Sequence, residues 1–442
     1  MKFYIHKLGC PKNDVDADYL TARLVAEGHQ PVTNPNEAES ILVNTCGFIL
    51  QAKEESIHEL LRFAGLKQTG ELKTLYATGC LSQRHGNELL DGLPELDGAF
   101  GIGELDAVAD AVTAQKQARP AVFTEAARLD YLDWKSRWVD ENIGYAYLKI
   151  SDGCDRCCAY CSIPQIRGEF RSRPIESIVQ EAEFLAGSGK KELILVSQDA
   201  TMYGHEDQQQ SHPPILSLLR RLEEIDALRW IRLMYLHPAG LGDALINYMA
   251  DDNKTLPYFD LPLQHINDTI LSSMRRGIDR AGIERLIGNI RSSSSLSAIR
   301  TTLIVGLPGE TQAYFDELRD FVAEQRFDRM GVFSYSQEEG TAAAELPDQV
   351  PAEVRYRRLD QLMTIQQEIA FEKNISLIGE TRDIIIDSIQ EDGLAIGRTY
   401  ADCPDVDQEV KVKGGAPRVG DILQVRITAS EGYDLEGTVV EG

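Results

Sequence analysis

The sequence predicts an α/β protein of three parts: an N-terminal parallel α/β domain, a partial (βα)6 barrel of the TIM type, and a small antiparallel β-barrel. Three observations predict this fold class. Short apolar runs alternate with helical patterns in the first part, and the alternation resumes after residue 140. From residue 376 onward, about five short alternating runs stand between turns, as in a small closed barrel.

Length and composition agree with a globular protein of several domains. The chain has 442 residues, of which 43% are hydrophobic and 26% charged. No apolar run approaches the roughly 18–20 residues of a membrane span, and the first residues do not resemble a signal peptide. We therefore expect no membrane association and a cytoplasmic location. In that reducing compartment the eight cysteines are better explained as metal ligands than as disulfides.

The charge of the chain limits its partners. The net charge is −25 at pH 7, whereas proteins that hold nucleic acid usually present a basic surface. Nucleic acid is therefore not expected as a direct substrate. Residues 376–442 contain six Arg or Lys and fourteen Asp or Glu, a net charge of −8. The predicted C-terminal barrel suits a basic protein as its partner.

Three strands predicted in the N-terminal part each lead to a cysteine. Parallel strands with right-handed crossovers place their carboxyl ends at one sheet edge, where ligands gather. Cys10, Cys46 and Cys80 follow such strands. Two interpretations remain open here: a three-cysteine cluster site, or three buried thiols packed in loops. The predicted elements are strands over 3–8, 40–43 and 72–77 and helices over 16–28 and 52–63.

The middle part repeats a strand–helix unit about six times, which predicts an open or partial barrel with active residues at the strand carboxyl ends. Gln198, His237, His265 and the turn Gly306–Glu310 stand at such ends. The histidines are interpreted as hydrogen-bonded pocket wall rather than metal ligands. The turn, taken alone, is better explained as a simple turn than as a ligand contact. The predicted strands are 145–150, 192–197, 230–235, 257–261, 298–306 and 329–335, and the helices include 175–188, 213–225, 313–324 and 353–373.

Four cysteines lie together in the loop after the first of these strands. Cys154, Cys158 and Cys161 have the spacing Cys-x3-Cys-x2-Cys, with the aromatic Tyr160 before the third. Three thiolates so close together can hold one iron–sulfur cluster and leave one iron open. A zinc site fits less well, because two of the cysteines are adjacent and no second Cys-x2-Cys pair lies nearby. Cys157 permits an alternative ligand set, Cys154-x2-Cys157-x3-Cys161. If Cys158 is the ligand instead, Cys157 is interpreted as a small packing residue.

This loop resembles that of the radical S-adenosylmethionine (SAM) superfamily, and motifs along essentially the whole chain resemble its methylthiotransferases. These motifs are Gly9–Asn13, Asn44–Gly47, Thr78–Cys80, Ser151–Cys154, Ser162–Pro164, Arg167–Gly168, Ser172–Pro174, Pro262–His265 and Gly306–Glu310. The resemblance implies a radical SAM barrel and a TRAM-like C-terminal barrel. The expected domains are an N-terminal methylthiotransferase cluster domain (1–118), a linker (119–139), a radical SAM core domain (140–375) and a TRAM-like β-barrel (376–442).

The resemblance also implies the cofactors, which are two 4Fe-4S clusters and SAM. One cluster binds SAM at its open iron and cleaves it to a 5′-deoxyadenosyl radical, and the other carries the methylated sulfur. The implied ligands are Cys154, Cys158 and Cys161 for the first cluster and Cys10, Cys46 and Cys80 for the second. The residues implied to line the SAM pocket are Tyr160, Gln198, His237, Gly306, Pro308, Gly309 and Glu310.

Within this family one branch modifies a tRNA adenosine, and another adds a methylthio group to the β-carbon of an aspartate in the twelfth small-subunit ribosomal protein. The resemblance implies the second branch. It also implies an electron donor such as flavodoxin or ferredoxin, and a basic protein substrate that the acidic barrel binds. The alternatives are the tRNA branch and a non-catalytic iron–sulfur carrier. Cys157, where the family usually has another residue, is given no role. The segments that resemble the second branch are Pro11–Asn13, Gly397–Asp402, Pro404–Asp407 and Glu431–Asp434.

Overall fold

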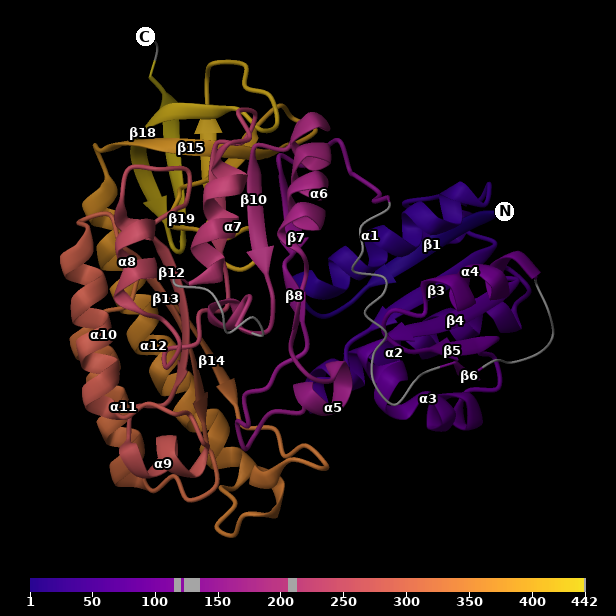
Figure 1. Ribbon diagram of the computed structural model, residues 1–442, viewed down its shortest axis with the longest axis horizontal. Coiled ribbons are helices and arrows are strands. Elements are labelled where there is room, and N and C mark those ends of the chain that lie inside the picture. Colours follow the sequence, from indigo (N-terminus) through magenta and orange to yellow (C-terminus); the bar gives the residue numbers. More distant parts are fainter. Residues whose placement is uncertain (115–120, 123–135, 206–212, 441–442) are drawn as a thin grey trace. The chain divides into compact units, whose positions relative to one another are not determined.

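The computed structural model describes residues 1–114, 121–122, 136–205 and 213–440. The chain divides into two compact units, and each is made of chain segments that are far apart in the sequence (Figure 1). The first unit is Met1–Val139, Lys149–Gln180 and Ser336–Ala344, and the second is Asp140–Leu148, Glu181–Tyr335 and Glu345–Gly442.

The first unit contains a six-stranded sheet with the strand order β2-β1-β3-β4-β5-β6. Every neighbouring pair is parallel, as the sequence predicts. Three of the strands are very short and were not predicted. The strands are β1 (Lys2–Lys7), β2 (Gln30–Pro31), β3 (Ser40–Thr45), β4 (Thr74–Gly79), β5 (Gly98–Phe100) and β6 (Ala121–Val122), and the helices are α1 (Pro11–Ala26), α2 (Leu50–Gln68), α3 (Cys80–Gly92) and α4 (Leu105–Ala114).

Both faces of this sheet are buried, because successive side chains of a strand point to opposite faces. In β3, Ile41 and Val43 pack with α2 and α3. Leu42, between them, packs with α1 and α4 on the other face. Helices on both faces explain why β3 is apolar without alternation.

Most of the predicted linker, 119–139, lies outside the described residues. Within it, Ala121 and Val122 form β6 and pair with β5. Arg137 forms an ion pair with Asp18 of α1 at 3.0 Å. The part of this segment that the structure describes is therefore attached to the first unit.

The cysteine loop also belongs to the first unit. It lies between the two short strands β8 (Ser151–Asp152) and β9 (Arg171–Ser172), which pair antiparallel. The short helix α5 (Ile163–Arg167) follows the last cysteine of the loop.

The second unit contains most of the predicted partial barrel, while Lys149 and residues 175–180 of the barrel segment are grouped with the first unit. The barrel strands form two three-stranded sheets, β11-β10-β7 and β12-β13-β14, and a parallel bridge between Ile231 and Thr255 connects β11 to the chain just before β12. The six strands agree with the prediction. They are β7 (Tyr145–Lys149), β10 (Glu192–Val196), β11 (Trp230–Leu233), β12 (Tyr258–Gln264), β13 (Ala298–Val305) and β14 (Arg329–Ser334), and the helices are α6 (Ile175–Gly187), α7 (Pro214–Glu223), α8 (Asp243–Ala250), α9 (Asp268–Ser273), α10 (Arg280–Ser293), α11 (Gln312–Gln325) and α12 (Ala352–Leu377).

The C-terminal barrel is closed, with the strand order β15-β16-β17-β19-β18. Four of its pairs are antiparallel, and β17 and β19 are parallel. A closed ring of five strands cannot alternate in direction throughout, so one parallel pair follows from the strand number. The strands are β15 (Thr381–Ile389), β16 (Ala395–Arg398), β17 (Val410–Lys413), β18 (Ile422–Glu431) and β19 (Asp434–Val439).

Buried ion pairs attach this barrel to the first residues of the core strands, all within the second unit. Glu192, at the start of β10, accepts from Arg232 of β11 at 2.8 Å and from Arg398 of β16. Both guanidinium groups and the carboxylate are buried. Arg398 also pairs with Asp387 of β15 at 2.8 Å. We call Glu192, Arg232, Arg398 and Asp387 the base cluster.

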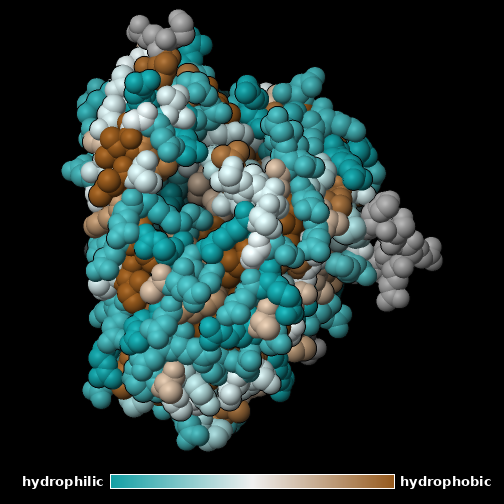
Figure 2. Space-filling view, turned by 90° about the vertical axis from the view of Figure 1, so that its left-hand side faces the viewer, coloured by the Kyte–Doolittle hydropathy of each residue, from teal (hydrophilic) through white to brown (hydrophobic). Residues whose placement is uncertain are grey.

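The surface in Figure 2 is mostly hydrophilic, and its apolar residues form small separate groups. Scattered apolar residues of this kind are normal on folded proteins. In the described part of the chain, no helix has the length and apolar character that a membrane crossing requires.

Candidate metal centres

Three cysteines meet at the carboxyl edge of the N-terminal sheet. β1, β3 and β4 are neighbours, and Lys7 lies opposite Asn44, which lies opposite Thr78. A cysteine follows each strand two or three residues beyond this line. The sheet therefore brings together residues that are more than thirty positions apart in the sequence. They are Cys10, Cys46 and Cys80.

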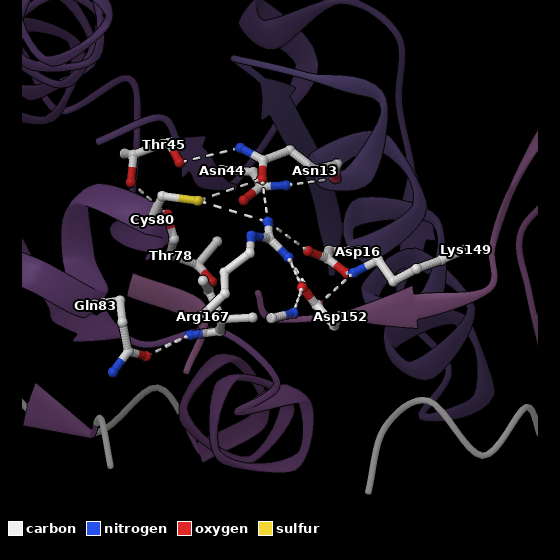
Figure 3. A network of polar contacts seen from close by, with 12 residues as sticks. Asn13, Asp16, Asn44, Thr45, Thr78, Cys80, Gln83, Lys149, Asp152 and Arg167 are labelled. Atoms are coloured by element: carbon white, nitrogen blue, oxygen red, sulfur yellow. Dashed lines mark hydrogen bonds and ion pairs between the residues drawn. The ribbon is translucent and has the colours of Figure 1, made fainter. Parts of the chain in front are cut away.

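Two asparagine side chains tie the three loops to one another. Asn13 Nδ2 donates to Leu8 O at 2.8 Å and to Thr45 O at 3.2 Å. Asn44 Nδ2 donates to Asn13 O at 2.7 Å. The Cys80 thiol donates to Asn13 Oδ1, with Sγ at 3.6 Å (Figure 3). The two amide groups thus connect backbone carbonyls of the first two loops and of α1.

Gly79, immediately before Cys80, allows the loops to approach closely. Its φ is +91°, and a Cβ there would lie 2.4 Å from Asn44 Oδ1 and 2.7 Å from Thr45 O. Only glycine combines this backbone conformation with the available space. The tight turn lets α3 begin at Cys80 itself.

Two of these three thiols have a raised pKa. Burial raises the pKa of Cys46 to about 12, and the neighbouring thiols Cys80 and Cys10 add to the rise. Burial also raises the pKa of Cys80, whereas the positive charge of Arg167 lowers it and partly offsets this rise. Metal binding at such thiols must release their protons. Among the described residues no group of three His, Cys, Asp or Glu is placed to hold a single ion. Cysteine thiolates are nevertheless the ligand type that holds iron–sulfur clusters.

Backbone N–H groups donate to sulfur in the second cysteine set. Arg156 N donates to Cys154 Sγ at 3.4 Å, and Ile163 N donates to Cys161 Sγ at 3.5 Å. Cys154 N in turn donates to Gly168 O at 3.1 Å, which holds the start of the loop. Hydrogen bonds of this kind stabilise thiolates that carry a cluster.

Cys157 differs from the other cysteines of the loop. Its side chain is exposed, and its thiol donates to Asp155 O with Sγ at 3.6 Å. Cys154 is buried, and Cys158 and Cys161 are half-buried. This placement favours the register with Cys158 as a ligand and leaves Cys157 at the surface.

Gly153 offers a direct test of the loop. Its φ is +77°, and a Cβ would lie 2.0 Å from Glu169 O. We expect Gly153→Ala to displace the loop and remove about half of the iron of anaerobically purified protein. The matched control is Gly65→Ala in α2, where a Cβ meets nothing within 4 Å. Full iron content in Gly153→Ala would contradict the expectation.

The segment Ser336–Ala344, after β14, contacts both cysteine regions of the first unit. Glu338 is 1% exposed and pairs with Lys53 at 2.7 Å and Arg84 at 3.0 Å. Arg84 also donates to Gly47 O at 2.8 Å, next to Cys46. Ala343 N donates to Ala159 O at 2.8 Å, inside the cysteine loop.

The residues predicted to line the SAM pocket fall in both units. Tyr160 is half-buried in the first unit. In the second unit, Gln198 follows β10, His237 follows β11, and the turn Gly306–Glu310 follows β13. These positions are the carboxyl ends of the barrel strands, where ligands bind in such folds. That these residues line one pocket stays a prediction.

Glu310 has a structural role in its turn. Its Oε2 accepts from Gly306 N at 2.7 Å and Leu307 N at 3.3 Å, and its Oε1 accepts from Arg358 at 2.8 Å. Burial nevertheless raises the pKa of Glu310 to about 7. Burial lowers the pKa of His265 to about 3, and Arg358 adds to this effect. The other predicted histidine, His237, accepts from Ala239 N at 3.2 Å.

Three further residues of the first unit had no predicted role. Figure 3 shows the Arg167 guanidinium directed toward Cys80, Asn13, Asp16 and Asp152. Asn13, Asp152 and Arg167 all stand in motifs beside the cysteines. That position beside the cysteines is the signal in the sequence that points to them.

Comparisons with known proteins match the three parts of the chain. Residues 2–101 match the family described as Uncharacterized protein family UPF0004, residues 148–322 the Radical SAM superfamily, and residues 378–440 the TRAM domain. The chain is 43% identical to ribosomal protein uS12 methylthiotransferase RimO of Syntrophomonas wolfei, covering 97% of this chain and 98% of that protein. It is 42% identical to the protein of the same name from Geobacter sulfurreducens, and the match covers 98% of this chain and 97% of that protein.

A solved structure supports the fold alone. The radical SAM methyltransferase TsrM of Kitasatospora setae, determined with cobalamin and a [4Fe-4S] cluster, aligns with a TM-score of 0.55 at 17% identity. The alignment covers 75% of this chain and 74% of that one. Fold and sequence thus define a radical SAM enzyme of the methylthiotransferase class. Because full-length relatives exceed 40% identity, the chain belongs to the RimO family of ribosomal protein uS12 methylthiotransferases.

Proposed function

We propose that this protein adds a methylthio group to the β-carbon of an aspartate in ribosomal protein uS12. One structural observation supports the proposal most strongly. The cysteines of the sheet edge and the cysteines of the loop belong to the same compact unit. The relatives named for this reaction match the chain over nearly its whole length.

The proposed ligands of the two clusters are thiols in two different settings. The sheet-edge set is held by loops that the asparagine amides connect, and the loop set receives N–H groups at its sulfurs. When bound, the clusters and SAM supply the electron, the radical and the methylated sulfur. The proposed ligands are Cys10, Cys46 and Cys80 at the sheet edge and Cys154, Cys158 and Cys161 in the loop.

The proposed SAM pocket uses residues at the strand carboxyl ends. Polar side chains stand there, and the open space beside Gly309, whose φ is +80°, would admit a ligand close to the backbone. The space beside Gly306 is filled by the Arg355 side chain. Within this set we assign Glu310 to holding the turn, because its carboxylate is already committed to two N–H groups and Arg358. The proposed set is Tyr160, Gln198, His237, Gly306, Pro308, Gly309 and Glu310.

The C-terminal barrel is proposed to bind the basic protein substrate. Its sequence carries a net charge of −8, which attracts a basic ribosomal protein and repels RNA. An external donor such as flavodoxin or ferredoxin is proposed to supply electrons. Because ribosomal proteins are the proposed substrate, we place the reaction in the cytoplasm. The proposed domains are the N-terminal cluster domain (1–118), a linker (119–139), the radical SAM core domain (140–375) and the TRAM-like barrel (376–442).

Mass spectrometry of a deletion strain tests the proposal. We expect uS12 from this strain to lack a methylthio group on one aspartate, while tRNA keeps its methylthio modification. The wild-type protein should restore the uS12 modification, and a Cys154→Ala variant should not. Loss of the tRNA modification, with the uS12 aspartate still modified, would show that the substrate assignment is wrong.

A further inference from the structure

A buried arginine of the cysteine loop lies against a thiol of the other cysteine set. Arg167, the last residue of α5, is 1% exposed. Its Nη2 lies 3.5 Å from Cys80 Sγ and donates to Asn13 Oδ1 at 2.8 Å. Asn13 in turn ties the sheet-edge loops together. One guanidinium nitrogen thus contacts both a cysteine of that edge and the side chain that orders the edge.

The other end of the same guanidinium holds the start of the cysteine loop. Arg167 Nη1 donates to Asp152 at 2.8 Å and 3.2 Å. Asp152 Oδ1 accepts from Gly153 N at 2.9 Å, one residue before Cys154. Arg167 is therefore a direct bridge between the two cysteine regions (Figure 3).

The ion pairs of Arg167 with nearby carboxylates explain why it is buried here, but they do not explain its contact with Cys80. Asp152 and Asp16 oppose the charges of Arg167 and Lys149. A buried guanidinium needs such partners, because removing a charge from water is costly. The carboxylates do not, however, require the contact with Cys80. A thiol in that position gains most when it is an ionised ligand beside a positive charge.

A fixed positive charge beside a cluster has a defined effect on its chemistry. Reduction adds a negative charge to the cluster, and a neighbouring cation stabilises the reduced form. Net charge and hydrogen bonds to sulfur are among the factors that set cluster potentials. Arginine remains protonated under all relevant conditions, so the effect is permanent.

We propose that Arg167 is a positioning residue for the cluster at Cys10, Cys46 and Cys80: it raises the reduction potential of that cluster and fixes the loop of the other cluster to it. The inference rests on the proposed ligands of the sheet edge. Without the charge of Arg167, the negative charges of Asp152 and Asp16 are opposed by Lys149 alone. The surroundings of the cluster become more negative, which favours its oxidised form.

A redox titration of a single cluster tests the proposal. The background is the full chain with Cys154, Cys158 and Cys161 replaced by alanine, so that the sheet-edge cluster is the one observed. In this background we expect Arg167→Gln to lower the midpoint potential. At the solution potential that half-reduces the parent, the ratio of reduced to oxidised cluster should fall about tenfold.

Two further variants separate charge from packing. Arg167→Lys keeps the positive charge and should retain iron with a midpoint above that of Arg167→Gln. If Arg167→Gln holds no iron, retained iron in Arg167→Lys supports the proposal. The control is Arg173→Gln, at a guanidinium that is 2% exposed and donates to Lys149 O and Ser177 Oγ. Its midpoint should equal that of the parent.

The outcomes are distinguishable. A parent background without iron would contradict the sheet-edge ligands, and the inference would fall with them. A parent with about four irons whose midpoint is unchanged by Arg167→Gln would overturn the role of Arg167 alone. Equal shifts in Arg167→Gln and Arg173→Gln, or equal behaviour of the Lys and Gln variants, would also overturn it.

Discussion

Replacing Cys10, Cys46 and Cys80 together by alanine is expected to lower the iron of anaerobically purified protein from about eight to about four atoms per chain. The loop cysteines lie in a separate segment with their own N–H donors, so their cluster should remain. Iron and acid-labile sulfide are measured in parallel. Wild-type iron in this variant would contradict the sheet-edge site.

The reciprocal replacement of Cys154, Cys158 and Cys161 should also leave about four irons. The matched control is Cys157→Ala, because this thiol is exposed and adjacent to a proposed ligand. We expect it to retain the wild-type iron content. If Cys157→Ala loses iron and Cys158→Ala does not, the rival register of the loop is correct.

The second large effect is expected at the base cluster. Glu192→Ala leaves the buried guanidinium groups of Arg232 and Arg398 without their shared carboxylate. Burial opposes ionisation of Glu192, but the two arginines outweigh it and lower its pKa. Removing one partner of such a buried network costs about 3–5 kcal/mol. We expect a lower thermal midpoint of the metal-free protein.

An exposed ion pair on the same barrel is the control for Glu192→Ala. Glu431 pairs with Lys411 at 2.8 Å, and the two side chains are 70% and 34% exposed, respectively. Surface pairs of this kind contribute little to stability. We therefore expect Glu431→Ala to unfold at the wild-type temperature. A wild-type midpoint for Glu192→Ala would show that the base cluster does not stabilise the second unit.

The architecture was predictable where the sequence pattern is long. The apolar runs of β3 and β4 exceed the length of a turn and end in glycine and cysteine, so their order and common edge follow from parallel pairing. β5 has three residues and β6 two, too few to show a period. The C-terminal barrel was expected to be antiparallel. A closed ring of five strands needs at least one parallel pair, and the structure shows that this pair is β17–β19.

The candidate site was likewise predictable only in part. The cysteines could be found from their spacing in the loop and from their positions at the ends of predicted strands. The contacts of Arg167 were not, because Asn13 is 154 positions away and Cys80 is 87. Side-chain contacts over such separations depend on how segments pack, and no local pattern encodes them. Glu310 was predicted as a pocket residue, but its contact with Arg358 was not, because that partner comes from α12.

The segment Ser336–Ala344 has a consequence for the order in which the protein is made. Arg84 and Lys53 reach the ribosome exit long before Glu338, which follows them by 254 and 285 residues. Domains generally fold from the N-terminal end during synthesis. The N-terminal sheet can therefore form early, but its two cations meet their carboxylate only when most of the chain has emerged. The contacts of the sheet edge near Cys46 are completed only after residue 338 has been made, although the sequence of that edge is translated early.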